Sequence, residues 1–137
     1  MMHLIKSEND DIYLEILPNF VSLSKTEKGL NVIKKLIIEI RWEKPQQTLI
    51  NLVLANQKDF LEDFYCNYAI QLMVQTWRTD MTVSLFSLIL GKIKQYSLQK
   101  SPSNVVETMI VNSDPQMRAQ YLKEIKEMVD LHCMVLI

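Results

Sequence analysis

The segment 67–74 reads Asn-Tyr-Ala-Ile-Gln-Leu-Met-Val, in which the apolar pair Ala69-Ile70 is followed four residues later by Met73-Val74. Residues three and four apart lie on one face of a helix, so this spacing predicts a helix with one buried side. Similar pairs recur at Val32-Ile33, 37 residues earlier, and at Val105-Val106, 36 residues later. The spacing therefore indicates a helical repeat of about 36 residues.

Apolar residues outside these pairs recur with the same spacing. Seven further columns, each with one apolar residue in three successive units, agree at offsets of 37 and then 36 residues. They are Ile12, Leu49 and Leu85; Tyr13, Ile50 and Phe86; Ile16, Val53 and Ile89; Leu17, Leu54 and Leu90; Leu23, Phe60 and Tyr96; Leu36, Met73 and Met109; and Ile37, Val74 and Ile110. This agreement indicates three successive copies of one helical unit.

Each unit is predicted to contain two main helices, with a short helical turn between them in the later units. The main helices are expected at 11–17, 26–40, 45–55, 65–76, 81–90 and 103–111, and the short turns at 57–61 and 92–97. Pro45 and Pro102 stand where helices are predicted to begin, since the first residue of a helix needs no N–H group. Residues 114–129 predict a further first helix without a complete second helix after it.

The fold class that follows is an all-α, right-handed α-solenoid of about three repeats and a truncated fourth. The units extend approximately over 11–44, 45–79 and 80–113, with a partial unit over 114–137. Stacked repeats need neighbours to cover their faces. The chain, 1–137, is therefore expected to be a fragment of a longer repeat domain.

The composition fits long helices and excludes several classes of protein. Two Gly and four Pro in 137 residues are too few for a turn-rich β-sandwich or barrel. Fifteen basic residues against sixteen acidic ones give a net charge of −1, which leaves no strong overall field to gather nucleic acid. Two Cys and two His supply neither a disulfide framework nor a zinc site, so no metal and no other cofactor is expected.

No feature of the sequence predicts catalysis or membrane insertion. A nucleophile–base pair, a phosphate-binding loop and a metal cluster are all missing from the sequence, so the protein is not expected to be an enzyme. Apolar runs fall far short of the roughly 20 residues that span a bilayer, and the first residues do not resemble a signal peptide. A cytoplasmic protein is expected.

Polar residues flank the apolar pair of each predicted second helix. In the second and third units, three residues form a trio. Two polar residues of the trio lie four positions apart, so they point the same way, and the third residue directly follows the first of them. These trios are Asn67, Tyr68 and Gln71, and one repeat later Ser103, Asn104 and Glu107. A single trio is typical of a solvated helix face, but two trios in the register of the repeat indicate a binding surface.

The two trios resemble the recognition helices of the Pumilio (PUF) family of single-stranded RNA-binding repeat proteins. Residues 64–71, Phe-Tyr-Cys-Asn-Tyr-Ala-Ile-Gln, match such a helix with Cys66 where glycine is usual. Residues 101–107, Ser-Pro-Ser-Asn-Val-Val-Glu, are more similar still, to the penultimate repeat of typical members. The resemblance extends from about Asp11 to the end of the chain. It implies that each repeat recognises one base through two or three side chains of its second helix.

For the second unit, the resemblance implies recognition of uracil. Asn67 and Gln71 would contact the edge of the base, with Tyr68 stacking on its face. The Gln amide offers both a donor and an acceptor, as the uracil edge requires.

For the third unit, the resemblance implies recognition of guanine. Ser103 and Glu107 would contact the base edge, with Asn104 at the stacking position. A carboxylate only accepts hydrogen bonds, which suits the N1–H and N2–H₂ donors of guanine. Protein and RNA are antiparallel in the family, so the third and second units would recognise 5′-GU-3′.

The first unit departs from the family pattern. Leu30 replaces the first polar residue and cannot hydrogen-bond a base, and Lys34 replaces the usual Gln or Glu. Asn31 keeps the stacking position. We expect this unit to recognise a base poorly, or to contact phosphate through Lys34 or Lys35.

The implied function is sequence-selective binding of single-stranded RNA in post-transcriptional regulation, on the 3′ untranslated region of messenger RNA and with protein co-regulators as further partners. Two alternatives remain open. One is a protein-interaction scaffold on the same α-solenoid, whose polar face binds a peptide or nothing. The other is a PUF-like ribosome-assembly factor, which would be nucleolar.

Overall fold

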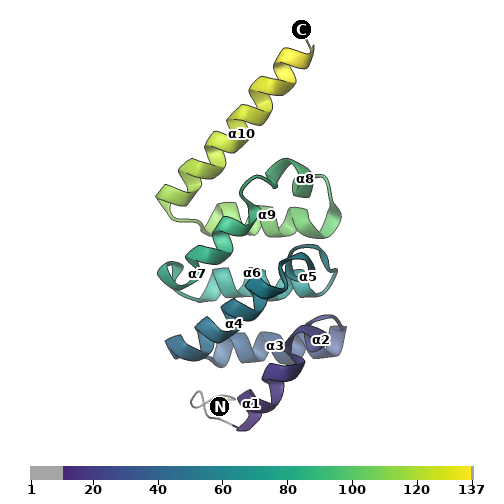
Figure 1. The fold of residues 1–137 in the computed structure, drawn as a ribbon, viewed down its shortest axis with the longest axis vertical. Helices are drawn as coiled ribbons and strands as arrows, with labels where there is room; N and C mark the ends of the chain where they lie inside the picture. Colours follow the sequence, from purple (N-terminus) through teal and green to yellow (C-terminus); the bar gives the residue numbers. More distant parts are fainter. Residues whose placement is uncertain (1–10, 137) are drawn as a thin grey trace.

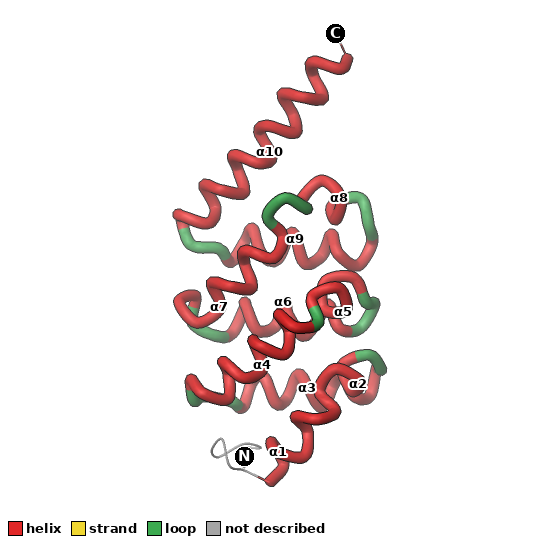
Figure 2. Tube along the Cα trace, in the orientation of Figure 1, coloured by secondary structure: helices red, strands yellow, loops and turns green. Residues whose placement is uncertain are grey.

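The computed structural model describes residues 11–136, which form helices joined by short loops and include no strand (Figure 2). The first unit contains α1 (Asp11–Ile16), a 3-10 turn η1 (Leu17–Asn19), α2 (Phe20–Ser24) and α3 (Glu27–Glu39). The second contains α4 (Glu43–Ala55), α5 (Gln57–Glu62) and α6 (Cys66–Thr76). The third contains α7 (Thr79–Phe86), a 3-10 turn η2 (Ser87–Ile89), α8 (Ile93–Ser97) and α9 (Lys100–Asn112), and α10 (Pro115–Leu136) follows.

Equivalent helices of successive units stack into an elongated array. Figure 1 shows α3, α6 and α9 one above the other along the long axis, with α2, α5 and α8 at one end of that row. The second helices pack directly on each other, α3 on α6 and α6 on α9, and α4 packs on α7 in a separate row. The prediction of an all-α solenoid is confirmed.

The core follows the repeat because the same column supplies a buried side chain in each unit. Leu36, Met73 and Met109 occupy equivalent positions on α3, α6 and α9, and all three are fully buried. Between the first and second units, the rings of Phe20 and Phe60 stack with their centroids 5.4 Å apart. Large apolar side chains buried in this way supply most of the stabilisation of each unit.

Two of the predicted apolar positions are exposed at the start of the array. Ile12 is 45% exposed although Leu49 and Leu85 in its column are fully buried. Val32 is 42% exposed although its equivalents on α6 and α9 are fully buried. The helices that carry those equivalents, α6 and α9, each pack on the second helix of the preceding unit, whereas the described residues include no second helix before α3. The short helix α2 was also missing from the prediction, and its Phe20 supplies the ring that stacks on Phe60 of the second unit.

The prolines do not begin helices as predicted. Pro45 and Pro102 are each the third residue of their helix, since α4 begins at Glu43 and α9 at Lys100. The first four N–H groups of an α-helix have no partner within the helix, so proline is tolerated at this position as well. The predicted helix at 81–90 ends as an α-helix at Phe86, and the 3-10 turn η2 completes it.

Hydrogen bonds between units fix the stacking. The indole Nε1 of Trp77, which is 7% exposed, donates to the carbonyl oxygen of Ile37 over 2.9 Å. The carbonyl groups in the last turn of α3 have no partner within the helix, so Trp77 satisfies one of them from the next unit.

The long helix α10 is anchored to the third unit through its first half. The hydroxyl of Tyr121 donates to the carbonyl oxygen of Phe86, and burial raises the pKa of this phenol. The Glu124 carboxylate accepts from the backbone N–H groups of Gly91 and Ile93, over 2.5 and 3.0 Å. None of the helices in residues 11–136 is both long and apolar enough to cross a membrane.

Candidate nucleic-acid interface

The candidate interface is the polar face formed by α3, α6 and α9, here called the second-helix face. Successive units share one register, so equivalent positions on the three helices lie on the same face. The stacking positions of the three units are all exposed, and the positions three residues further on are exposed or half-buried. The face comprises Asn31 and Lys34 on α3, Tyr68 and Gln71 on α6, and Ser103, Asn104 and Glu107 on α9.

Two direct contacts join this face across the units. The ammonium group of Lys34 lies over the ring of Tyr68, 5.3 Å from its centroid. The hydroxyl of Thr108 donates to Oε1 of Gln71 over 2.8 Å. Side chains of α6 are therefore in contact with both neighbouring second helices, and the face is continuous over the three units.

Asn67 is placed differently from the expectation that it faces a base. Asn67 is buried, with only 1% of its surface exposed. Its Nδ2 group donates to the carbonyl oxygens of Asp63 and Phe64, over 2.8 and 2.7 Å, and its Oδ1 accepts from Nε2 of Gln71 over 2.8 Å. Asn67 thus secures the start of α6 and holds Gln71, and in this conformation it has no free donor for a base.

The acidic residue of the third unit is free. Glu107 is exposed and makes no hydrogen bond or ion pair with another of the described residues. Ser103 lies one turn before it, half-buried, and its hydroxyl donates to the carbonyl oxygen of Lys100 over 2.8 Å. Oγ of Ser103 can still accept a hydrogen bond. The third unit therefore presents acceptors to solvent.

Two solved structures superpose on most of this chain. One is the Puf4 RNA binding domain bound to HO endonuclease RNA 3′ UTR recognition sequence, with a TM-score of 0.80 over 87% of this chain at 17% identity. The other is PUF-8 in complex with PBE-RNA, with a TM-score of 0.78 over 88% of this chain at 12% identity. The fold is Pumilio-like. This chain spans 37% and 36% of the length of those two chains.

The likeness lies in the fold and not in a close sequence relationship. No family model matches the sequence, and no curated protein matches it. The Pumilio-like fold is nevertheless a stack of equivalent helices, with α3 packed on α6 and α6 on α9.

In the first unit of this Pumilio-like array, an apolar residue replaces the first polar residue of the trio. Leu30 is 4% exposed and packs in the core, where it cannot contact a ligand. Asn31 is exposed, and half-buried Lys34 lies beside Tyr68 of the next unit. The cation is close enough to the ring for a cation–π contact. Lys34 therefore borders the second unit's stacking position as well as its own.

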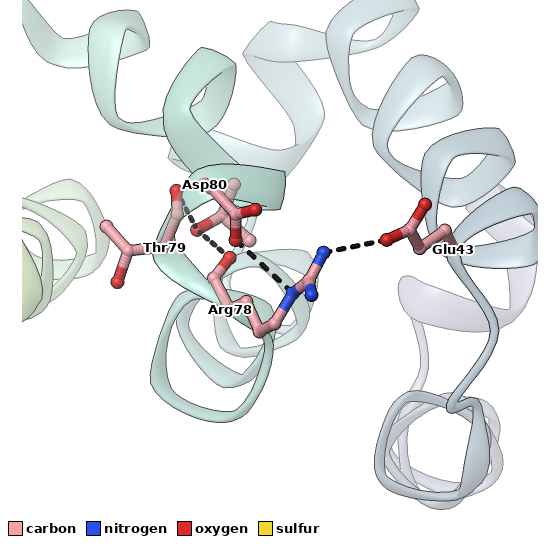
Figure 3. Close-up of polar contacts among 5 residues, drawn as sticks. Glu43, Arg78, Thr79 and Asp80 are labelled. Atoms are coloured by element: carbon pink, nitrogen blue, oxygen red, sulfur yellow. Dashed lines mark hydrogen bonds and ion pairs between the residues drawn. The ribbon is translucent and has the colours of Figure 1, made fainter.

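Some charged side chains of this Pumilio-like array are paired with one another and others are not. Arg78 is engaged by two acids: its Nη2 lies 2.7 Å from Oε1 of Glu43, and its Nε lies 3.3 Å from Oδ1 of Asp80 (Figure 3). Figure 3 shows the guanidinium group reaching from the start of α7 to the start of α4. Lys35 and Lys100 are exposed and have no ion pair among the described residues.

The described residues include no cluster of His, Cys, Asp or Glu able to hold a metal ion. Cys66 begins α6 and is fully buried, and burial together with the nearby Asp63 raises the pKa of its thiol to about 12. A thiol in that state is a poor nucleophile at neutral pH.

One residue of the face escaped the sequence reasoning. Thr108 follows Glu107 and is half-buried between α6 and α9, where it holds Gln71. Its equivalents in the repeat are Leu72 and Lys35, so no pattern of residue type marks the position. Only the distance between the two helices reveals its role.

Proposed function

We propose that the second-helix face binds single-stranded RNA and that the third and second units recognise the sequence 5′-GU-3′. The observation that carries this is Glu107, an exposed, unpaired carboxylate placed one repeat after the Gln71 amide on stacked helices. An acceptor-only group suits guanine, and an amide suits uracil. Both solved structures that share the fold were determined with RNA bound, which supports the same class of ligand here.

Different residues would stack on the bases and contact the base edges. Tyr68 and Asn104 stack on bases, Gln71 contacts uracil, and Ser103 and Glu107 contact guanine. Asn67 contributes by holding Gln71, and it touches uracil directly only if its amide leaves Asp63 and Phe64. Asn31 stacks in the first unit, and Lys34 contacts phosphate.

The biological setting belongs to the same proposal. The protein acts in post-transcriptional regulation, on 3′ untranslated regions of messenger RNA in the cytoplasm, without catalysis and together with protein co-regulators. Units at about 11–44, 45–79, 80–113 and 114–137 form part of one larger RNA-binding domain. Three or four units bind weakly alone, so the relevant affinities are measured at low salt, where phosphate contacts are strongest.

The test is a titration of the chain with short fluorescent RNAs that contain GU or AU. The wild-type protein is expected to prefer G over A, and Glu107→Gln to reduce that preference by ~1–3 kcal/mol, the scale of a good base-specific contact. Gln is close to Glu in size, so packing changes little. Glu127→Gln on exposed α10 is the matched control and should leave the preference unchanged.

A second variant separates base contacts from phosphate contacts. Lys34→Gln should weaken binding to both RNAs alike and reduce the salt dependence, by about one unit in the slope of log K against log salt. If the wild-type chain binds both RNAs equally, or binds neither at low salt, RNA recognition is excluded and the protein-interaction scaffold replaces it.

A further inference from the structure

Gln71 is held at both ends of its amide by other side chains. Its Nε2 donates to Oδ1 of Asn67 over 2.8 Å, and its Oε1 accepts from the hydroxyl of Thr108 over 2.8 Å. Asn67 is on the same helix, whereas Thr108 is on α9 of the next unit. The side chain proposed to recognise uracil is therefore fixed between two units.

The direction of these hydrogen bonds is determined by the backbone. Nδ2 of Asn67 faces two carbonyl oxygens, those of Asp63 and Phe64, and a carbonyl oxygen can only accept. The other end of the Asn67 amide must then be its oxygen, so the end of Gln71 that faces it must be the donor Nε2. Oε1 of Gln71 consequently faces Thr108, which donates. The amide orientation, usually ambiguous between O and N, follows here from the chain of partners.

The fixed amide keeps one N–H and one oxygen lone pair free for a ligand. At base position N3, uracil carries a donor and cytosine an acceptor. An amide whose Oε1 faces N3 accepts a hydrogen bond from the N3–H group of uracil. With cytosine, the same Oε1 faces a bare N3, which is also an acceptor, so no hydrogen bond forms. A freely rotating amide would turn its Nε2 towards the N3 of cytosine and tolerate both bases. Orientation, and not only residue type, thus decides between the two pyrimidines.

We propose that Thr108 is a specificity-determining positioning residue, which holds Oε1 of Gln71 towards the base so that the second unit binds uracil and rejects cytosine. This inference rests on the proposed RNA-binding function. Thr108 acts through Gln71 and not by touching RNA, since its hydroxyl hydrogen is already given to Oε1. Among the described residues, only this pair of units has a threonine placed to hold the amide of the preceding unit, because the positions equivalent to Thr108 are Leu72 and Lys35.

The experiment compares wild type, Thr108→Val and Thr108→Ser in titrations with short RNAs that contain GU or GC. Val keeps the branched shape and removes the donor, and Ser keeps the donor. Wild type and Thr108→Ser should prefer GU by about tenfold, and Thr108→Val by only about twofold. Thr76→Val is the matched control, because the hydroxyl of Thr76 bonds within its own helix to Leu72 and its loss should not change the ratio.

The outcomes separate this inference from the proposed function. The preference for G over A at the third unit should remain in Thr108→Val, which shows that the face is still intact. If Thr108→Val lowers the affinities for GU and GC equally, or leaves their ratio unchanged, the positioning role is overturned while RNA recognition stands. If the wild-type chain shows no base preference at all, the proposed function fails and this inference fails with it.

Discussion

Asp63 stabilises the start of α6. The Asp63 carboxylate accepts from the backbone N–H groups of Tyr65 and Cys66, both over 2.9 Å, and so satisfies donors that the helix itself leaves unpaired. The same carboxylate lies close to the buried thiol of Cys66. These hydrogen bonds hold the start of the helix that carries Tyr68 and Gln71.

Cys66 provides a pH test of this arrangement. Its thiol pKa rises from 9.0 to about 12 on folding, so between these values the unfolded chain loses a proton that the folded chain keeps. The free energy of unfolding should then fall as the pH rises from about 9 towards 12, and be unaffected by this group below pH 9. The difference is measured by urea denaturation of a chain in which the second cysteine of the sequence, Cys133, is replaced by Ser, with and without the further change Cys66→Ala. Equal pH slopes for the two chains would show that the thiol is not held neutral by the fold.

At the scale of helices, the interface between units depends on a few specific contacts. Trp77 is buried against α3 and hydrogen-bonded to Ile37, whereas Trp42, just after the end of α3, is 41% exposed. The two tryptophans therefore provide a matched pair of positions for measuring the strength of the interface.

Trp77→Phe should lower the free energy of unfolding by about 1–3 kcal/mol, because it removes a buried hydrogen bond and leaves a carbonyl group unsatisfied. Trp42→Phe should change it by less than about 0.5 kcal/mol, as exposed substitutions usually do. Chemical denaturation followed by circular dichroism measures both. A larger loss in Trp42→Phe than in Trp77→Phe would mean that the units do not stack as described.

The repeat and its second helices were predictable from the sequence, because burial at helical spacing leaves a direct record in the apolar columns. The short helix α2 was not, since five residues are too few to show a period. The burial of Asn67 and the role of Thr108 also escaped prediction. Both depend on hydrogen bonds whose partners are identified only once the helix ends and the distance between helices are known.

At the scale of the whole molecule, the last helix exposes apolar positions that the inner units bury. Leu122 is 56% exposed, although Ile50 and Phe86 in its repeat column are buried. Val129 is 54% exposed, although its equivalent Ile93 is 2% exposed. These side chains form an apolar strip on α10 that favours association.

The isolated chain should therefore self-associate, and Leu122→Gln should weaken the association without lowering the stability of the monomer. Leu98→Gln is the control, since Leu98 is 82% exposed and outside the repeat columns. Sedimentation velocity over a range of concentrations measures the effect. Equal effects of both variants would point to general surface hydrophobicity and not to the strip on α10.

NMR can show whether the second-helix face binds RNA. A short RNA containing GU is titrated into the ¹⁵N-labelled chain at low salt. The signals of Tyr68, Gln71, Asn104 and Glu107 are expected to shift, and those of Asn51 on α4 to stay in place. Shifts confined to α4 and α7, or no shifts at all, would contradict RNA binding by the second-helix face.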